Sequence, residues 1–131
     1  MPLTPDGELC ERWRQLMTRY HDISCALERA LSQQHDLGIS EFETLDLLVK
    51  SPCGKQFVHE LQANIHLSQS ALSRTVARLE KRGLVTRAMC TDDRRAVSVT
   101  PTEKGRRLHA EAAPTHAAIL SEHRGELQPQ G

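Results

Sequence analysis

The segment 67–81 carries short polar side chains and guanidinium groups at helical spacing. It reads LSQSALSRTVARLEK, and its candidate recognition residues are Gln69, Ser70, Ser73, Arg74 and Arg78. Serine and glutamine are short donors and acceptors that can approach base edges without blocking the entry of a helix into a groove. Arginine can bind a phosphate or the edge of a guanine. The chemistry that these residues offer is therefore hydrogen bonding and ion pairing with duplex DNA.

A single predicted helix positions these side chains. Ser68 is its expected N-cap and Gly83 ends it, while its apolar positions fall on one stripe, formed by Leu72, Val76 and Leu79. Two strand-like runs follow, near 85–90 and 96–99, and flank a turn that carries Asp92, Asp93, Arg94 and Arg95. A buried stripe, an arginine-bearing outer face and a basic hairpin tip together predict a winged helix-turn-helix.

Further helices are expected on both sides of this unit. From 8 to about 32, apolar residues recur in steps of three and four, which predicts a long amphipathic helix. A capping-box sequence at 40–43 starts a second helix, and 55–63 forms a short third one. After the wing, Thr102 is expected to cap a last helix, which Pro114 should kink or divide.

The composition fits one compact domain. Of the 131 residues, 38% are hydrophobic and 26% are charged, which is ordinary for a globular protein. No apolar run approaches the roughly 20 residues of a membrane span, and the N-terminus lacks the pattern of a secretion signal. We therefore expect a cytoplasmic protein with no membrane partner, whose cysteines, at 10, 25, 53 and 90, are reduced thiols.

The charges are unevenly distributed along the chain, although 17 basic and 17 acidic residues give a formal net charge of zero. Between Leu67 and Arg107 there are ten Lys or Arg residues and four Asp or Glu residues, a net charge of +6. The rest of the chain holds seven basic and thirteen acidic residues, a net charge of −6. A basic segment on an acidic support favours a binding face for an anionic partner such as DNA.

The order of the predicted elements and three sequence runs resemble the MarR family of bacterial transcription regulators. The runs are LSQSALSRTVARLEKRGLVTR, DDRRAVSV and TEKG, and the likeness extends from about Ile39 to Arg107. The resemblance implies a mainly α fold with a small two-stranded β wing. It divides the chain into an N-terminal dimerisation helix at 1–38, a winged helix-turn-helix DNA-binding domain at 39–101 and a shortened C-terminal dimerisation helix at 102–131.

This resemblance implies a DNA-binding transcriptional regulator, a repressor that binds a near-palindromic operator as a homodimer. The recognition helix of the family matches 69–81, and its groove-facing positions match the five candidate residues named above. The family's Asp-x-Arg wing motif matches Asp93-Arg94-Arg95. Arg95 would then enter the minor groove, Asp93 would steady it, and Arg94 would lie beside them. Family members commonly carry a further helix at the C-terminus, for which 121–131 leaves no room.

The resemblance also implies that DNA is released when a small aromatic molecule binds between the dimerisation helices and the winged domain. The candidate ligand contacts are His21, Cys25, Phe42 and His109. A pocket with aromatic walls would have few residues to draw on, because the chain contains only four: Trp13, Tyr20, Phe42 and Phe57.

Two other sensing mechanisms remain open. Cys10 lies near the start of the first helix, where the helix dipole favours a thiolate, and some relatives use such a cysteine as a peroxide sensor. Those sensors surround the thiol with tyrosines, whereas Tyr20 is the only tyrosine here. His109, His116 and His123 recur every seven residues, but zinc needs three or four converging ligands, which would require a second chain. We predict no metal and no other cofactor.

Two other classes of protein are less consistent with the sequence. Motifs typical of enzymes, such as GxSxG, the Walker loop, HExxH and the Rossmann fingerprint, do not occur, so we predict that the chain is not an enzyme. A winged helix that binds protein instead of DNA usually loses its basic helix face and basic wing, whereas this chain has both.

Overall fold

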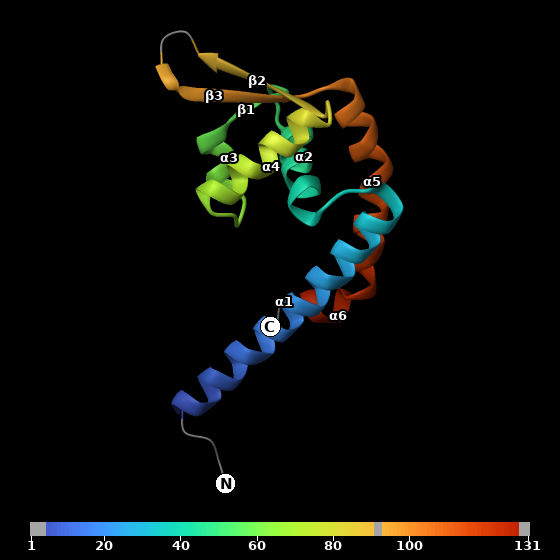
Figure 1. Ribbon diagram of the computed structural model, residues 1–131. Coiled ribbons are helices and arrows are strands. Elements are labelled where there is room, and N and C mark those ends of the chain that lie inside the picture. The colour runs from blue at the N-terminus through green and yellow to red at the C-terminus, as the bar shows by residue number, and fades with distance from the viewer. Residues whose placement is uncertain (1–4, 91–92, 129–131) are drawn as a thin grey trace.

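Helices make up most of the computed structural model, which describes residues 5–90 and 93–128, apart from the side chains of residues 5, 90 and 93–95. In chain order the elements are α1 (Pro5–His35), α2 (Ile39–Lys50), β1 (Gln56–Phe57), α3 (Val58–Asn64), α4 (Gln69–Lys81), β2 (Val85–Cys90), β3 (Asp93–Pro101), α5 (Glu103–Glu122) and α6 (Arg124–Leu127). In Figure 1, α1 runs away from the winged unit, α5 lies beside its C-terminal part, and the β2–β3 hairpin projects at the opposite end. The predicted mainly α fold with a wing is confirmed.

The sheet has three antiparallel strands in the order β1-β3-β2. The predicted two-stranded wing is the β2–β3 hairpin, in which Arg87 pairs with Val99. The third strand, β1, adds Gln56 and Phe57 to the other edge of β3 and was missed, because the residues were assigned to the start of the third helix. Two residues are too short to show the alternating pattern of a strand. The helix α3 therefore begins only at Val58.

The apolar stripe of α1 divides into two halves with different environments. The C-terminal half is buried against the rest of the protomer and contributes Ile23, Leu27, Ala30 and Leu31. The N-terminal half leaves large apolar side chains in water, namely Leu9, Trp13, Leu16, Met17 and Tyr20. Trp13 is 59% exposed and Tyr20 is 70% exposed, which is far more than a large aromatic side chain usually shows.

The start of α2 differs from the prediction. Gly38, not Ser40, is the N-cap, and the carboxylate of Glu41 accepts a hydrogen bond from the Gly38 N–H at 3.0 Å. The N–H of Ile39 donates to Glu28 of α1 at 2.8 Å. Two carboxylates thus satisfy the first two amides of this helix, as the positive end of the helix dipole favours. The predicted capping box at 40–43 was wrong, because it took the helix to begin two residues too late.

The last long helix, α5, continues through Pro114 as one element. Of the two predicted effects of Pro114, division of the helix is therefore wrong, and a kink stays a prediction. Proline removes one backbone hydrogen bond, but the helix is held on both sides of it. Ala112 is buried in the core, and the Thr115 hydroxyl lies 2.7 Å from Nε2 of His35 at the end of α1. The Thr102 hydroxyl caps α5 by accepting from the Gly105 N–H at 3.1 Å, as predicted.

One apolar core joins residues from all three predicted segments of the chain. Leu31 of α1 and Ala112 of α5 pack in the same cluster as Phe42, Leu45, Leu48, Leu61, Leu72, Val76, Leu79 and Val99. The first turn of α5 crosses the chain just after α4 at very short range. The Thr102 N–H donates to the Leu84 carbonyl oxygen at 3.0 Å, and a Cβ on Gly105 would stand 2.1 Å from that same oxygen. This crossing fixes α5 against the start of the wing.

Candidate nucleic-acid interface

The helix α4 has one buried face and one exposed face. Leu72, Val76 and Leu79 are buried, as their spacing predicts, and Thr75 is buried beside them with its hydroxyl donating to the Ala71 carbonyl oxygen at 2.9 Å. The five candidate recognition residues are all exposed: Gln69, Ser70, Ser73, Arg74 and Arg78. The structure therefore places all five on the outer surface of one helix, away from the core.

Local hydrogen bonds explain why this helix begins where it does. The Ser68 hydroxyl accepts from the Ala71 N–H at 3.1 Å, which confirms the predicted N-cap. The preceding turn is held from below by Ile65, which is buried, and by Leu67, which is half-buried. The amide of Gln62 on α3 also donates to the Leu67 carbonyl oxygen. The Gln62 hydrogen bond thus connects α3 to the turn that precedes Gln69 and Ser70.

The two arginines of the outer face differ in their bonding. Arg78 donates to the Thr75 hydroxyl at 3.4 Å, a long and weak hydrogen bond. Arg74 makes no ion pair and no side-chain hydrogen bond with any part of the chain that the structure describes. Its guanidinium is therefore free to bind an external anion such as a phosphate, without first breaking an internal contact.

The wing is tied to α4 through Arg87, an arginine that was not among the predicted site residues. Arg87 of β2 donates from Nε at 3.1 Å and from Nη2 at 2.8 Å to the same carboxylate oxygen of Glu80. This hydrogen bonding lowers the pKa of Glu80. The side chains of Asp93, Arg94 and Arg95 lie outside the described part of the chain, so their predicted roles in the minor groove remain predictions.

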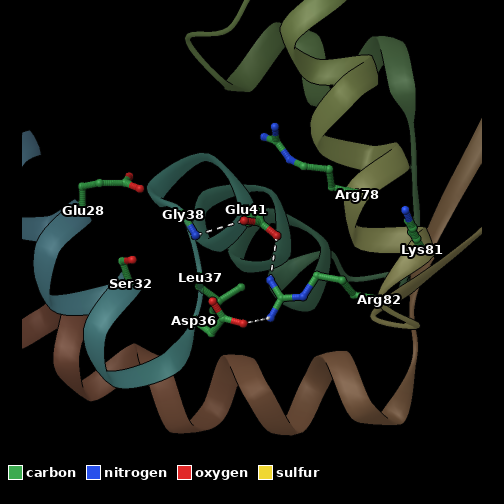
Figure 2. A pocket seen from close by; sticks show the side chains of 9 residues that line it. All are labelled: Glu28, Ser32, Asp36, Leu37, Gly38, Glu41, Arg78, Lys81 and Arg82. Carbon is green, nitrogen blue, oxygen red and sulfur yellow. Dashed lines mark hydrogen bonds and ion pairs between the residues drawn. The ribbon is translucent and has the colours of Figure 1, made fainter.

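A cleft of about 520 Å³ opens between the α1–α2 turn and the C-terminal half of α4. Figure 2 shows acidic side chains on the α1–α2 side and basic side chains on the α4 side. The residues that line it are Glu28, Ser32, Asp36, Leu37, Gly38, Glu41, Arg78, Lys81 and Arg82. The cleft therefore adjoins the candidate recognition helix directly.

An ion pair that was not predicted from the sequence crosses this cleft. Arg82 Nη1 donates to Glu41 Oε2 at 2.9 Å, and Arg82 Nη2 lies 3.7 Å from a carboxylate oxygen of Asp36. Of these acids, Glu41 is 12% exposed and Asp36 is 98% exposed, so the pair with Glu41 is the stronger of the two. No local spacing could have revealed it, because its partners are 41 positions apart.

The four residues predicted to contact a ligand form two separate pairs, and none of them lines the cleft of Figure 2. His21 and Cys25 are exposed on α1, with Sγ 3.6 Å from Nε2. Phe42 and His109 are buried between α2 and α5, with ring centroids 5.4 Å apart. Phe42 is thus a core residue already stacked on histidine. The prediction that these four residues contact a ligand is not tested by their positions.

Phe42 is the centre of a stack of rings that joins α2 to α5. The ring centroid of His109 lies 5.4 Å from that of Phe42, and the ring centroid of His116 lies 4.5 Å from it. The His109 Nε2–H donates to Asp46 Oδ1 at 2.8 Å, and Lys50 donates to Asp46 Oδ2 at 3.0 Å. Burial works to raise the pKa of Asp46, but the hydrogen bonds from His109 and Lys50 outweigh it, so this pKa is lowered.

Burial also lowers the pKa of His116, with the charges of Lys50 and His109 acting in the same direction and that of Asp46 against it. The folded chain therefore binds a proton at His116 less readily than the unfolded chain. The stability that neutral His116 contributes is complete above the ordinary histidine pKa of about 6.5 and is lost as the pH falls below it.

For this reason, we expect the midpoint temperature of thermal unfolding to decrease when the pH is lowered from about 7.5 to about 5.5. The variant His116→Phe keeps a ring against Phe42 without a titrating group, so it should show a smaller fall. His66→Gln, which removes an exposed histidine, is the control, and its midpoint should decrease with pH as much as that of the unmodified chain. Identical pH profiles for His116→Phe and the unmodified chain would contradict this assignment.

The cysteines and histidines considered for sensing are dispersed. Cys10, Cys25 and Cys53 are exposed free thiols, whereas Cys90 has no described side chain. Because α1 begins at Pro5, Cys10 lies beyond its first turn, and Tyr20 is ten residues further on, about 15 Å along the axis. Within residues 5–90 and 93–128, no three His, Cys, Asp or Glu side chains are grouped so that they could hold a metal ion.

The described helices also include none with the length and apolar content that a membrane crossing requires.

The helix-turn-helix of α3 and α4, the β2–β3 hairpin and the exposed polar face of α4 define a winged helix-turn-helix protein. The sequence model of the MarR family matches residues 37–97. The HTH-type transcriptional regulator MhqR of Bacillus subtilis (strain 168) is 33% identical over 107 residues, which cover 82% of this chain and 72% of that protein. The chain therefore belongs to the MarR family of transcriptional regulators.

Two solved structures agree with this assignment. AbsC, a MarR family transcriptional regulator from Streptomyces coelicolor, is 28% identical, with a TM-score of 0.81 over 98% of this chain and 85% of AbsC. Sco3205, a MarR family transcriptional regulator from the same organism solved in complex with DNA, is 26% identical, with a TM-score of 0.84 over 98% of this chain and 79% of Sco3205.

Proposed function

We propose that this regulator is a ligand-responsive repressor that binds a near-palindromic DNA operator as a homodimer. The observation that carries the proposal is the outer face of α4, where Ser70, Ser73 and Arg74 are exposed and the Arg74 guanidinium has no partner in the described part of the chain. Ser73 and its neighbours would read base edges in the major groove, and Arg74 and Arg78 would bind phosphate or guanine. Asp93, Arg94 and Arg95 would form the minor-groove contact of the wing.

The exposed half of α1 supports the homodimer. Leu9, Trp13, Leu16 and Tyr20 recur at helical spacing and are each more than half exposed in the protomer. A stripe of large apolar side chains of this kind marks a protein–protein interface. We take a second copy as its partner, because a near-palindromic operator requires two recognition helices related by a two-fold axis. The segments 1–38 and 102–131 would then form the dimerisation region around 39–101.

The dimer can be broken at this stripe. The double variant Trp13→Glu/Leu16→Glu places two carboxylates at its centre, so we expect a monomer by light scattering where the unmodified chain is a dimer. Operator binding should weaken with it, because each half-site would have to be bound alone. Arg12→Glu/Gln15→Glu, which adds two acids at polar positions of the same helix, is the matched control and should remain dimeric. A dimeric Trp13→Glu/Leu16→Glu variant would place the interface elsewhere.

The DNA-binding proposal is tested by selection of genomic fragments with the purified protein, followed by gel shifts at two salt concentrations. We expect recovery of a near-palindromic site whose half-site centres are roughly 10 base pairs apart, and an affinity that falls steeply with salt. Ser73→Ala should change which sequences are preferred. A monomer without any sequence preference would instead favour a winged-helix module that binds protein.

The cleft of Figure 2 supports the ligand response, because it is open to solvent and shares Arg78 with the candidate DNA interface. A small aromatic acid bound there would contact α4 and the α1–α2 turn together. Compounds of this class can be screened for a rise in the unfolding temperature and for release of operator DNA. Ser32→Trp, which would fill the cleft, should abolish the release. An unchanged response in Ser32→Trp would direct attention to His21, Cys25, Phe42 and His109.

A thiol-based response through Cys10 is the second candidate, favoured only by the exposure of this thiol. Peroxide should then release DNA from the unmodified chain and not from Cys10→Ser.

A further inference from the structure

We propose that Glu41 and Arg82 are positioning residues, which fix the orientation of α4 relative to the α1–α2 turn without touching DNA. The inference rests on the proposed DNA-binding function, and it adds two residues that the outer face of α4 does not contain. The affinity for DNA would then depend on an ion pair between two parts of the protein.

The ion pair is placed where one contact can control the angle of a helix. Arg82 is the C-cap of α4 and its backbone N–H donates to the Arg78 carbonyl oxygen at 3.1 Å, so its backbone continues the recognition helix. Its guanidinium reaches Glu41 in the first turn of α2, with Nη1 and Oε2 2.9 Å apart. Glu41 is 12% exposed and Arg82 is 32% exposed, so solvent screens this pair less than a surface pair.

The Glu41 carboxylate serves two helix ends at once. One oxygen accepts from the Gly38 N–H at 3.0 Å and so caps α2, while the other accepts from Arg82 at the end of α4. An acid at a helix N-terminus and a base at a helix C-terminus both complement the helix dipoles. The start of α2 and the end of α4 are therefore joined by a single group.

Further contacts hold Arg82 from other directions. The Lys104 ammonium of α5 donates to the Arg82 carbonyl oxygen at 3.0 Å, and Asp36 lies 3.7 Å from the guanidinium on the side of the α1–α2 turn. Figure 2 shows the Arg82 guanidinium directed towards Glu41 and Asp36, whereas Arg78 and Lys81 have no interaction drawn to these acids. Of these three basic residues at the end of α4, Arg82 is thus the one that pairs with acids across the cleft within the described part of the chain.

A positioning role and a purely electrostatic role of Glu41 predict opposite effects of its replacement on DNA affinity. If charge alone mattered, replacing an acid near the DNA by a neutral residue would strengthen binding, because DNA is an anion. If Glu41 holds Arg82 and α4 in place, the same replacement should weaken binding. The two members should also be coupled, since either change breaks the same ion pair.

The experiment compares Glu41→Gln, Arg82→Gln and the double variant on an operator fragment recovered with the unmodified full chain. We expect the affinity of each single variant for the fragment to be at least about threefold lower than that of the unmodified chain. The affinity of the double variant should be no lower than that of the single variant that binds less tightly. The slope of log affinity against log salt should stay unchanged, because no phosphate contact is removed. Glu43→Gln is the matched control: it removes an acid from the same helix, and Glu43 has no ion pair to α4 within the described residues.

Each alternative outcome overturns the inference. Tighter or equal binding by Glu41→Gln would show that Glu41 acts only as a charge. A decrease of about two in the salt slope for an Arg82→Gln dimer would show that Arg82 contacts phosphate directly. Thermal unfolding of every variant is measured in parallel to check that it folds. If Arg82→Gln does not fold, Arg82→Lys replaces it; this variant keeps the charge and should bind DNA less tightly than the unmodified chain, and equal binding would contradict the positioning role.

The inference and the proposed function fail in distinguishable ways. If the unmodified chain binds no selected fragment, the proposed function fails. If the unmodified chain binds and all three variants bind as it does, only the positioning role fails.

Discussion

Arg74→Ala is expected to weaken operator binding by about 2–6 kcal/mol in the dimer, since one specific nucleic-acid contact contributes about 1–3 kcal/mol and the change occurs in both protomers. We expect a large effect because Arg74 is exposed on α4 and has no partner in the described part of the chain. Its guanidinium can therefore bind DNA without first breaking an internal contact. Gel shifts over a range of salt concentrations measure the loss.

The same titration shows what Arg74 contacts. A phosphate contact predicts weaker binding to all sequences and a salt slope smaller by about two for the dimer, whereas a guanine contact predicts relaxed sequence preference. Arg124→Ala, which removes an exposed arginine from α6, is the control and should bind normally. If Arg74→Ala bound as tightly as the unmodified chain, α4 would not be the recognition helix in the sense proposed here.

Gly105→Ala should give the second large effect, a loss of about 3 kcal/mol in the free energy of unfolding, near the upper end of typical overpacking costs. An added Cβ would stand 2.1 Å from the Leu84 carbonyl oxygen, which is backbone and has no rotamer to relieve the clash. The hydrogen bond from Thr102 to that same oxygen would be strained together with the first turn of α5. The midpoint of thermal unfolding should fall by roughly 10 °C.

Gly125→Ala provides the matched control for this substitution. Nothing lies within 4 Å of the position that its Cβ would take, so this variant should melt close to the unmodified chain. Equal melting of Gly105→Ala and Gly125→Ala would mean that α5 does not cross Leu84 as closely as the structure has it.

The elements with strong periodicity could be predicted from the sequence. Leu72, Val76 and Leu79 mark the buried stripe of α4, and Ser68 and Thr102 are recognisable caps because a cap depends only on residues three positions away. The exposure of the five candidate residues on α4 follows from the same stripe. Local signals therefore sufficed for the outer face of α4.

The features that the sequence did not reveal depend on distant contacts. The strand β1 exists only because β3 lies beside it, and Glu41 holds Arg82 across 41 positions. Local reasoning preferred Ser40 as the cap because serine is the commoner cap residue. The stacking of Phe42 on His116 likewise joins α2 to α5 across distant positions and was not predicted from the sequence.

The division of α1 into a buried half and an exposed half bears on how the protein acquires its helical structure. No side chain from 6 to 22 is buried in the protomer, so this arm gains little stability from tertiary packing. A solitary helix of that length is marginal in water. If the proposed dimer packs Trp13 and Leu16 against a second copy, the arm would gain the burial that it lacks, and its folding would become a bimolecular event. At low protein concentration the winged unit would remain folded while the arm unwinds, so that protein abundance itself sets how much of the chain is helical.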